Sequence, residues 1–137
     1  MWHSRGVGPN GDAAGMAKSF VYTYIDLKDV GDVLGVSFKQ SSILDQRTID
    51  EIGRELEQAE LEAAANRKLL VSFQGVDFMS SAMLGKLVQL HKRCKADKIK
   101  LKLCSIANNP LDVFKITRLD KLFEIHPDAN AALAKFA

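Results

Sequence analysis

The chain contains few of the residues that form disulfide bonds or metal centres. It has two cysteines, Cys94 and Cys104, and three histidines in 137 residues. No Cys-x-x-Cys pair and no cluster of histidines accompanies them, so the sequence carries neither a disulfide framework nor a zinc motif. Free cysteine is most often a core residue. We therefore expect two buried thiols, and we expect no metal and no cofactor.

The chain also has no excess of charge of one sign and no long hydrophobic run. Its 19 Lys and Arg against 17 Asp and Glu give a net charge of +2, which argues against a surface dedicated to nucleic acid or to anionic membranes. Its apolar runs are far shorter than the roughly 20 residues that cross a bilayer, and the N-terminus has no signal-peptide pattern. These absences predict a cytoplasmic protein with no membrane span and no direct contact with nucleic acid.

The length fits one domain, and a hydrophobic content of 47% can form a core. Residues 1–18 are rich in glycine and lack periodicity, which predicts a disordered lead-in before a domain over residues 19–137. The lead-in contains Gly6, Gly8 and Gly11 in the spacing of a dinucleotide-binding fingerprint. That fingerprint needs a strand before it and a helix after it. Neither a strand before these glycines nor a helix after them fits the sequence. A nucleotide-binding enzyme is therefore the weakest functional hypothesis.

The remaining sequence alternates strand-like and helix-like segments. Strand composition in residues 20–27 and 33–39, joined by a glycine-containing turn over 29–32, predicts a hairpin. Further strands are expected over residues 68–73, 98–106 and 121–126, and helices over 48–66, from the serine pair at 80 and 81 to 96, over 110–116 and over 127–136. This order, ββαβαβαβα, predicts an α/β fold with mixed strand directions.

Local signals predict where two of the helices begin. Thr48 and Glu51 have the spacing of a capping box, in which each side chain accepts a hydrogen bond from the other residue's backbone N–H. Asn109 before Pro110 predicts a second helix start, because Asn is a good cap and Pro lacks a donor that the first turn would leave unpaired. We therefore expect the first helix to be capped by Thr48 and the third by Asn109.

Periodicity predicts which side chains are buried. Residues 98–103 alternate lysine with apolar residues, the pattern of a strand with one solvated face. The lysines of the alternating run are Lys98, Lys100 and Lys102.

In the helix after Pro110, we expect Leu111, Phe114 and Ile116 to point inward.

Charge is distributed unevenly along the chain. Acidic residues dominate between residues 50 and 62, and basic residues dominate between 86 and 102. Two solvated faces would explain this pattern, because helix surfaces are commonly charged. Steering toward a protein partner of complementary charge would explain it as well. A nucleic-acid surface fits less well, because no stacking aromatics are interleaved with the basic residues.

The segment DFMSSAMLG, residues 77–85, joins a predicted strand to a predicted helix through Ser80 and Ser81. A helix cap would account for one serine, because the first N–H groups of a helix need an acceptor. A phosphoserine would also be tolerated here, because the helix dipole favours a phosphate, and its charge would alter a docking surface. No Gly-x-Ser-x-Gly elbow and no Walker loop is present, so we expect no catalytic residues and no enzyme activity.

Three segments together resemble STAS domains of the anti-sigma factor antagonist (anti-anti-sigma factor) family. VSFQGVDFMSSAMLGKLVQLHKR, residues 71–93, is similar to the family's central strand, Phe-Met-Asp-Ser-Ser/Thr-Gly-Leu-Gly motif and helix. SSILDQRTIDEIGREL, residues 41–56, is similar to its Gly-Glu-Leu-Asp loop and first helix, and residues 104–133 are similar to its tail. The resemblance covers about residues 18 to 135.

The resemblance implies a fold and a function. It implies a small mixed sheet with about four helices packed largely on one side. It also implies a partner, an anti-sigma factor that is an ATP-dependent serine kinase, which binds the unphosphorylated antagonist and releases the sigma factor. Ser81 takes the position of the phosphorylated serine. Ser80 is the less favoured candidate, because it stands where the family has Asp. The implied partner-binding residues are Asp45, Ser80, Ser81, Met83 and Leu84.

A second function remains open from the same resemblance. A constitutive STAS scaffold or a transport-accessory subunit would bind another STAS-binding protein and would never be phosphorylated. The replacement of the motif Asp by Ser80 favours this alternative. The sequence leaves open whether the domain forms a homodimer and whether Met16 is the true start.

Overall fold

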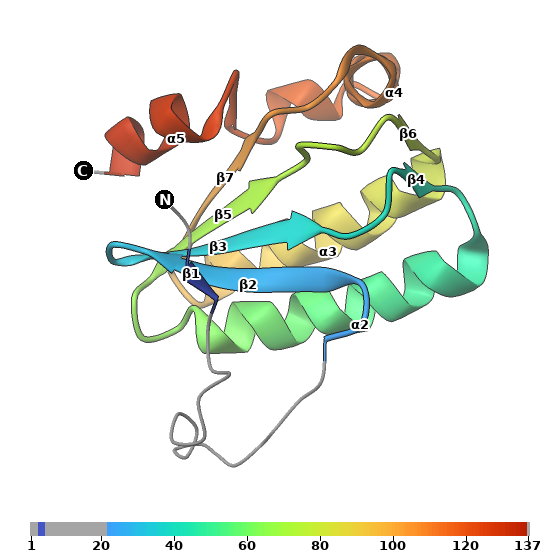
Figure 1. Cartoon of the computed structure of the whole chain (residues 1–137). Helices are drawn as coiled ribbons and strands as arrows, with labels where there is room; N and C mark the ends of the chain where they lie inside the picture. Colours follow the sequence, from blue (N-terminus) through green and yellow to red (C-terminus); the bar gives the residue numbers. More distant parts are fainter. Residues whose placement is uncertain (1–2, 5–21, 137) are drawn as a thin grey trace.

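The computed structural model describes residues 3–4 and 22–136, which form a central sheet with helices on both faces (Figure 1). Six strands pair in the order β1-β2-β3-β5-β7-β8, and β4 pairs with β6 in a separate two-stranded sheet. The strands are β1 (His3–Ser4), β2 (Ile25–Val30), β3 (Val33–Phe38), β4 (Ser42–Ile43), β5 (Lys68–Ser72), β6 (Phe78–Met79), β7 (Lys100–Cys104) and β8 (Ile125–His126). The helices are α2 (Gln46–Glu62), α3 (Ser81–Ala96), α4 (Asn108–Ile116), α5 (Ala129–Phe136) and the 3-10 helix η1 (Leu119–Lys121).

The sheet begins with the predicted hairpin and continues with parallel strands. β2 pairs antiparallel with β3, and Gly31, with φ at 65°, makes the turn between them. β3, β5, β7 and β8 then run parallel, each return crossing through a helix. The mixed α/β fold with four helices is therefore confirmed. The last strand is shorter than predicted, because Lys121 ends η1 and residues 122–124 form the turn that leads into β8.

β2 starts at Ile25, later than the predicted strand over residues 20–27. The buried carboxylate of Glu55 in α2 accepts hydrogen bonds from the backbone N–H groups of Thr23, Tyr24 and Ile25, at 2.8, 2.9 and 3.2 Å. These three donors are bound to a side chain, which fixes the path of the chain into β2. Residues 20 and 21 lie outside the described part of the chain.

The helices lie mainly on one face of the sheet. Apolar residues of α2, α3 and α4 share one core with alternate residues of the strands. On the opposite face, α5 packs Ala132 and Phe136 against Val33, Leu70 and Cys104. The expectation of helices packed largely on one side is thus confirmed, with α5 as the exception.

α5 also corrects the expectation of a strand with one solvated face. Lys100 is exposed, but Lys102 keeps only 6% of its surface accessible. Its Nζ atom lies 2.6 Å from Glu124 Oε2 and 4.9 Å from the centroid of the Phe136 ring. The prediction for Lys102 was wrong because α5 covers that face and supplies a cation–π partner.

The structure corrects the start and the buried face of α4. The helix begins at Asn108 after Ala107, which makes no side-chain cap, so Asn109 is not the cap. Phe114 is fully buried and Leu111 partly buried, as expected, whereas Ile116 is 81% exposed. Ile116 lies two positions after Phe114, about 200° further round the helix, and therefore points away from the core.

A buried glutamate of α2, Glu60, pairs with the half-exposed Arg93 of α3 between the C-terminal halves of the two helices. Glu60 has no exposed surface, and its Oε1 lies 3.3 Å from Arg93 Nη2. Burial, together with the neighbouring Asp97 carboxylate, raises the pKa of Glu60 to about 7. Cys94 and Cys104 are both buried free thiols, as predicted.

The predicted lead-in falls almost entirely outside the described residues. Residues 1–2 and 5–21, including the glycines at 6, 8 and 11, are not described. Within the lead-in, His3 and Ser4 form β1, which pairs antiparallel with Asp29 and Lys28 of β2.

Candidate functional site

The short parallel sheet of β4 and β6 brings the starts of α2 and α3 together (Figure 1). Ser42 pairs with Phe78, and Ile43 pairs with Met79. One residue further, the backbone N–H of Ser80 donates to the carbonyl oxygen of Ile43 at 2.9 Å. Two loops far apart in the sequence therefore lie side by side, and each leads directly into a helix N-terminus.

Asp45 is exposed and caps α2. Its Oδ2 accepts a hydrogen bond from the backbone N–H of Thr48 at 3.0 Å and lies 3.3 Å from the Thr48 hydroxyl. The predicted capping box starting at Thr48 is therefore wrong, because α2 begins at Gln46, before Thr48. A carboxylate at a helix N-terminus is stabilised by the helix dipole and by the free N–H groups of the first turn.

Ser80 and Ser81 have different environments. Ser80 is the cap of α3, with an extended backbone and with Oγ accepting from the N–H of Ala82 at 3.0 Å. Ser81 is the first residue of the helix, and its side chain is exposed. In the described part of the chain, no hydrogen bond engages the Ser81 hydroxyl. The structure thus assigns the cap to Ser80 and leaves Ser81 accessible.

Met83 and Leu84, both expected in the partner-binding surface, are core residues. Their exposed fractions are 0% and 2%, and they belong to the main hydrophobic core. Their side chains offer no contact area to a partner and instead hold the first turn of α3 against the sheet. Asp45, Ser80 and Ser81 remain as the accessible members of the predicted set.

Two exposed apolar residues at the same place were missed by the sequence analysis. Leu44, next to Asp45, is 58% exposed, and Phe78 in β6 is 51% exposed. Leu44 follows the buried Ile43, and Phe78 precedes the buried Met79. The buried side chains lie on the opposite face of the short sheet from the exposed ones. The alternation of strand side chains could have identified both residues, had the two-residue strands been recognised.

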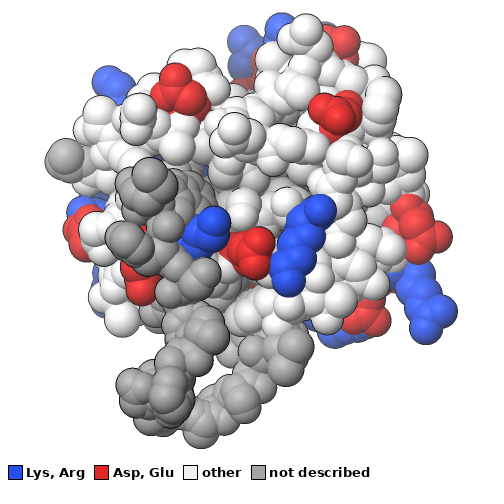
Figure 2. Space-filling model, in the orientation of Figure 1, with Lys and Arg blue, Asp and Glu red and all other residues white. Residues whose placement is uncertain are grey.

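The uneven charge along the chain is partly used inside the molecule. Lys86 Nζ lies 3.2 Å from Asp50 Oδ1, and Arg93 contacts Glu60, so the basic helix α3 pairs with the acidic helix α2. Lys86 lowers the pKa of Asp50, chiefly through their hydrogen bond. On the face seen in Figure 2, the charged side chains of both signs are scattered among uncharged residues. Ion pairing between α2 and α3 therefore explains part of the uneven charge, in addition to the solvated faces and the partner surface that the sequence suggested.

Residues 3–4 and 22–136 contain neither a metal site nor a membrane-spanning helix. No group of three or more His, Cys, Asp and Glu side chains there could hold a metal ion. No helix in that part of the chain is long and apolar enough to cross a membrane.

The sequence pattern of the STAS domain family matches residues 24–132, from the start of β2 into α5. The chain belongs to the STAS domain family. This assignment confirms the resemblance inferred from the motifs. A search among curated protein sequences finds no match.

Solved structures agree with the STAS fold. An anti-sigma factor antagonist (STAS) domain protein from Planctomyces limnophilus has 23% identity and a TM-score of 0.73, over 81% of this chain and 96% of its own. An anti-sigma factor antagonist from Mycobacterium paratuberculosis has 22% identity and a TM-score of 0.65, over 81% and 91%. SpoIIAA from Bacillus, in its phosphorylated form, has 14% identity and a TM-score of 0.61, over 82% and 99%. At these identities the similarity establishes the fold.

Proposed function

We propose that this STAS domain is an anti-sigma factor antagonist that binds an anti-sigma factor with serine kinase activity, and that phosphorylation of Ser81 controls the binding. The observation that carries the proposal is the difference between the two serines. Ser80 Oγ is engaged as the cap of α3, whereas the exposed Ser81 side chain is accessible to a kinase.

The position of Ser81 suits a reversible phosphate. The first turn of a helix presents free N–H groups and the positive end of the dipole, which stabilise an anion there. A phosphate adds about −1.5 to −2 charge at neutral pH. The fold would tolerate the phosphate, while the charge of the surrounding surface would change. A modification of this kind can release a bound partner without unfolding the domain.

The proposed docking surface consists of the accessible residues around Ser81. Leu44 and Phe78 offer apolar contact area, and Asp45 places a carboxylate beside Leu44. Exposed large apolar residues in one region mark interaction sites more often than isolated ones do. A partner that fits this surface would have an apolar recess and a basic residue next to it.

The structural neighbours support the proposal by their described roles. The domains from Planctomyces limnophilus and Mycobacterium paratuberculosis are described as anti-sigma factor antagonists. SpoIIAA, also described as one, has been solved in unphosphorylated and phosphorylated forms. These descriptions provide the reaction that Ser81 would undergo in this chain.

One observation favours the alternative of a constitutive STAS scaffold or transport-accessory subunit. Ser80 stands where the antagonist motif has Asp, and its side chain is engaged as a helix cap. Without that carboxylate, a kinase that recognises the usual motif would lose a contact next to the acceptor. A scaffold would use the same surface and leave Ser81 unmodified.

A phosphorylation assay distinguishes the two functions. The purified chain is incubated with ATP and the anti-sigma factor kinase encoded nearest to its gene, and the products are mapped by mass spectrometry. We expect one phosphate, lost in Ser81→Ala and retained in Ser80→Ala. Ser42→Ala, at an exposed serine of β4, is the matched control. In pull-downs, Ser81→Asp should bind the kinase more weakly than the unmodified chain does.

Two outcomes would decide against the proposal. Unchanged binding by Ser81→Asp would exclude Ser81 as the switch. If the chain binds the kinase but carries no phosphate after incubation with the kinase and ATP, the scaffold would be favoured.

A further inference from the structure

The carboxyl group of Glu60 is enclosed between α2 and α3 without a hydrogen bond. Glu60 has no exposed surface, and within the described part of the chain neither of its carboxyl oxygens has a hydrogen-bond partner. Arg93 Nη2 lies 3.3 Å from Oε1, and the buried Nε of Arg93 is unpaired as well. Buried carboxylates are normally hydrogen-bonded, because the burial of a poorly paired charge is costly. The surroundings of Glu60 therefore favour its neutral, protonated form.

The charges near Glu60 do not balance an ionised carboxylate. Asp97, which follows the last residue of α3, raises the pKa of Glu60 in addition to the effect of burial, and Arg93 opposes both. An ionised Glu60 would therefore share one guanidinium group with a second carboxylate. Arg93 is also 39% exposed and can be solvated by water instead.

The strands packed against the two helices supply no further base at this position. β5 and β7 turn apolar side chains, such as Val71 and Leu103, toward the helices. On the helix-facing side of β2, Ile25 and Leu27 are apolar and Asp29 is an acid. Among the described bases, Arg93 alone acts on Glu60.

The two halves of the contact between α2 and α3 are held differently. In the N-terminal halves, Lys86 Nζ lies 3.2 Å from Asp50 Oδ1, and both side chains reach solvent. In the C-terminal halves, the contact encloses Glu60. Both helices end close to it, and the chain then turns through Arg67 and Lys98, whose φ angles are 61° and 60°. Helix ends open at a lower free energy than a whole domain does, so the C-terminal halves can separate alone.

We propose that the contact between the C-terminal halves of α2 and α3 is a pH-sensitive switch, which is closed while the Glu60 carboxyl carries a proton and opens locally when that proton is lost. Opening would bring the carboxylate into water. The docking surface would stay in place, because Ser81 and Arg93 lie roughly 18 Å apart along α3 at about 1.5 Å per residue. The switch therefore does not depend on the function proposed for Ser81.

The pH range of the switch follows from the two states of Glu60. In the closed state its pKa is about 7, and in the open state the pKa returns toward the ordinary value of 4.5. The closed state binds the proton more tightly, so it is most favoured below about pH 4.5 and loses this advantage as pH rises to about 7. The open population should increase at least about tenfold between pH 5 and pH 8.

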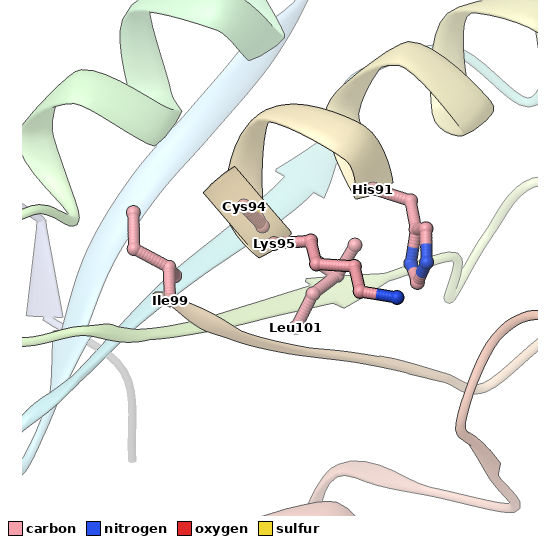
Figure 3. Close-up of a pocket in the computed structure, with 5 residues that line it drawn as sticks. All are labelled: His91, Cys94, Lys95, Ile99 and Leu101. Carbon is pink, nitrogen blue, oxygen red and sulfur yellow. The ribbon is translucent and has the colours of Figure 1, made fainter. Parts of the chain in front are cut away.

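Cys94 can report this opening, because it lies in the last turns of α3 and is 1% exposed. Figure 3 shows it next to Ile99 and Leu101, at an open depression of about 160 Å³ on the outer side of the helix. A small displacement of the helix end would expose the thiol to a reagent in this depression. Cys104, which is fully buried on the opposite face of the sheet together with Ala132 and Phe136 of α5, is the internal control.

The experiment measures the labelling of both cysteines in the complete chain. N-ethylmaleimide is added in timed pulses between pH 5 and pH 8, and peptide mass spectrometry gives a labelling rate for each cysteine. The ratio of the two rates removes the ordinary increase of thiol reactivity with pH. We expect the ratio of Cys94 to Cys104 labelling to rise at least about tenfold over this range.

Three variants test whether Glu60 is responsible. Glu60→Gln cannot ionise, so its ratio should change by less than about twofold. Asp97→Asn removes an exposed acid that raises the pKa of Glu60 and should reduce the rise. Asp112→Asn makes the same change at an exposed acid of α4 and should leave the rise as it is.

Three results would each overturn the proposal. The first is an equal pH dependence at the two cysteines, which unfolding of the whole domain would produce. The second is a rise that persists in Glu60→Gln. The third is an equal rise in Asp97→Asn and Asp112→Asn, a comparison of exposed positions that remains decisive even if Glu60→Gln fails to fold.

Discussion

The backbone N–H of Ser80 donates a 2.9 Å hydrogen bond to the carbonyl oxygen of Ile43. This bond extends the pairing of β4 with β6 and places the residue before α3 beside the strand before α2. Asp45 and Ser81 are therefore held by a shared backbone framework rather than by two independent loops. Changes to the exposed side chains of this site should alter binding without altering the framework.

The two serines should differ in their effect on stability. Ser80→Ala removes the acceptor for the Ala82 N–H and should lower the free energy of unfolding by about 1 kcal/mol. Ser81→Ala changes an exposed side chain and should stay within about 0.5 kcal/mol of the unmodified chain. Urea denaturation followed by circular dichroism measures both. Equal destabilisation by the two substitutions would contradict the assignment of Ser80 as the cap.

Asp45 can be changed so that its charge and its cap are separated. Asparagine caps a helix as well as aspartate does, so Asp45→Asn should keep the bond to Thr48 N–H and change stability by only a few tenths of a kcal/mol. Asp45→Ala loses the bond and should cost about 1 kcal/mol. A loss of kinase binding in Asp45→Asn, at unchanged stability, would then be due to the charge. If Asp45→Asn is as unstable as Asp45→Ala, the capping assignment fails.

Two glycines inside helices should respond differently to alanine. A Cβ atom added at Gly85 meets nothing within 4 Å, so Gly85→Ala should raise the free energy of unfolding by about 0.5–1 kcal/mol. A Cβ atom added at Gly53 would lie 2.7 Å from Lys86 Cδ. Gly53→Ala should displace Lys86, weaken its ion pair with Asp50 and gain less or lose stability. Denaturation midpoints of the two variants, compared side by side, check this difference.

The buried Glu60 should make the domain less stable as pH rises. Its folded pKa of about 7 lies above the ordinary value of 4.5, so the folded chain binds a proton more tightly than the unfolded chain does. The stability that this proton provides is fully present below about pH 4.5 and is lost as pH rises to about 7, by about 3 kcal/mol. Arg93 opposes the shift, and Asp97 adds to it.

Glu60→Gln tests this pH dependence. The variant should be more stable than the unmodified chain at pH 8, and the stability loss between pH 4.5 and 7 should be smaller. Glu57→Gln, at an exposed position of the same helix, should leave that loss unchanged. Unfolding free energies measured across the pH range decide the question. An identical pH profile for Glu60→Gln would show that Glu60 is not the group responsible.

The elements that the sequence could predict are those set by local patterns. Alternation and turn chemistry identified the hairpin, and the steps of three and four residues identified α2 because its packing follows helical periodicity. The cap of α2 was misplaced because Asp45 and Thr48 are both good capping residues, and only the backbone path shows which one comes first. β4 and β6, with two residues each, are too short to give a pattern.

The burial of several charged side chains could not be predicted from the sequence, because it depends on elements that are distant along the chain. Glu55 and Glu60 look like members of a solvated acidic face, yet both are buried, because their partners come from the chain before β2 and from α3. The alternating pattern predicted a solvated Lys102, but α5 covers this side chain in the structure. For the candidate site, the motif predicted that the serine pair lies between a strand and a helix, and the structure confirms that position and identifies Ser80 as the cap.

The bonds that Glu55 makes to the chain before β2 set a practical limit on shortened forms of the protein. Those three backbone donors, together with the Tyr22 hydroxyl that donates to Glu62 at 2.8 Å, anchor the entry to the sheet. A fragment beginning at residue 26 would bury a carboxylate with none of these donors and would express poorly. A fragment beginning at residue 20 would keep every one of them, which makes it the better choice for crystallisation.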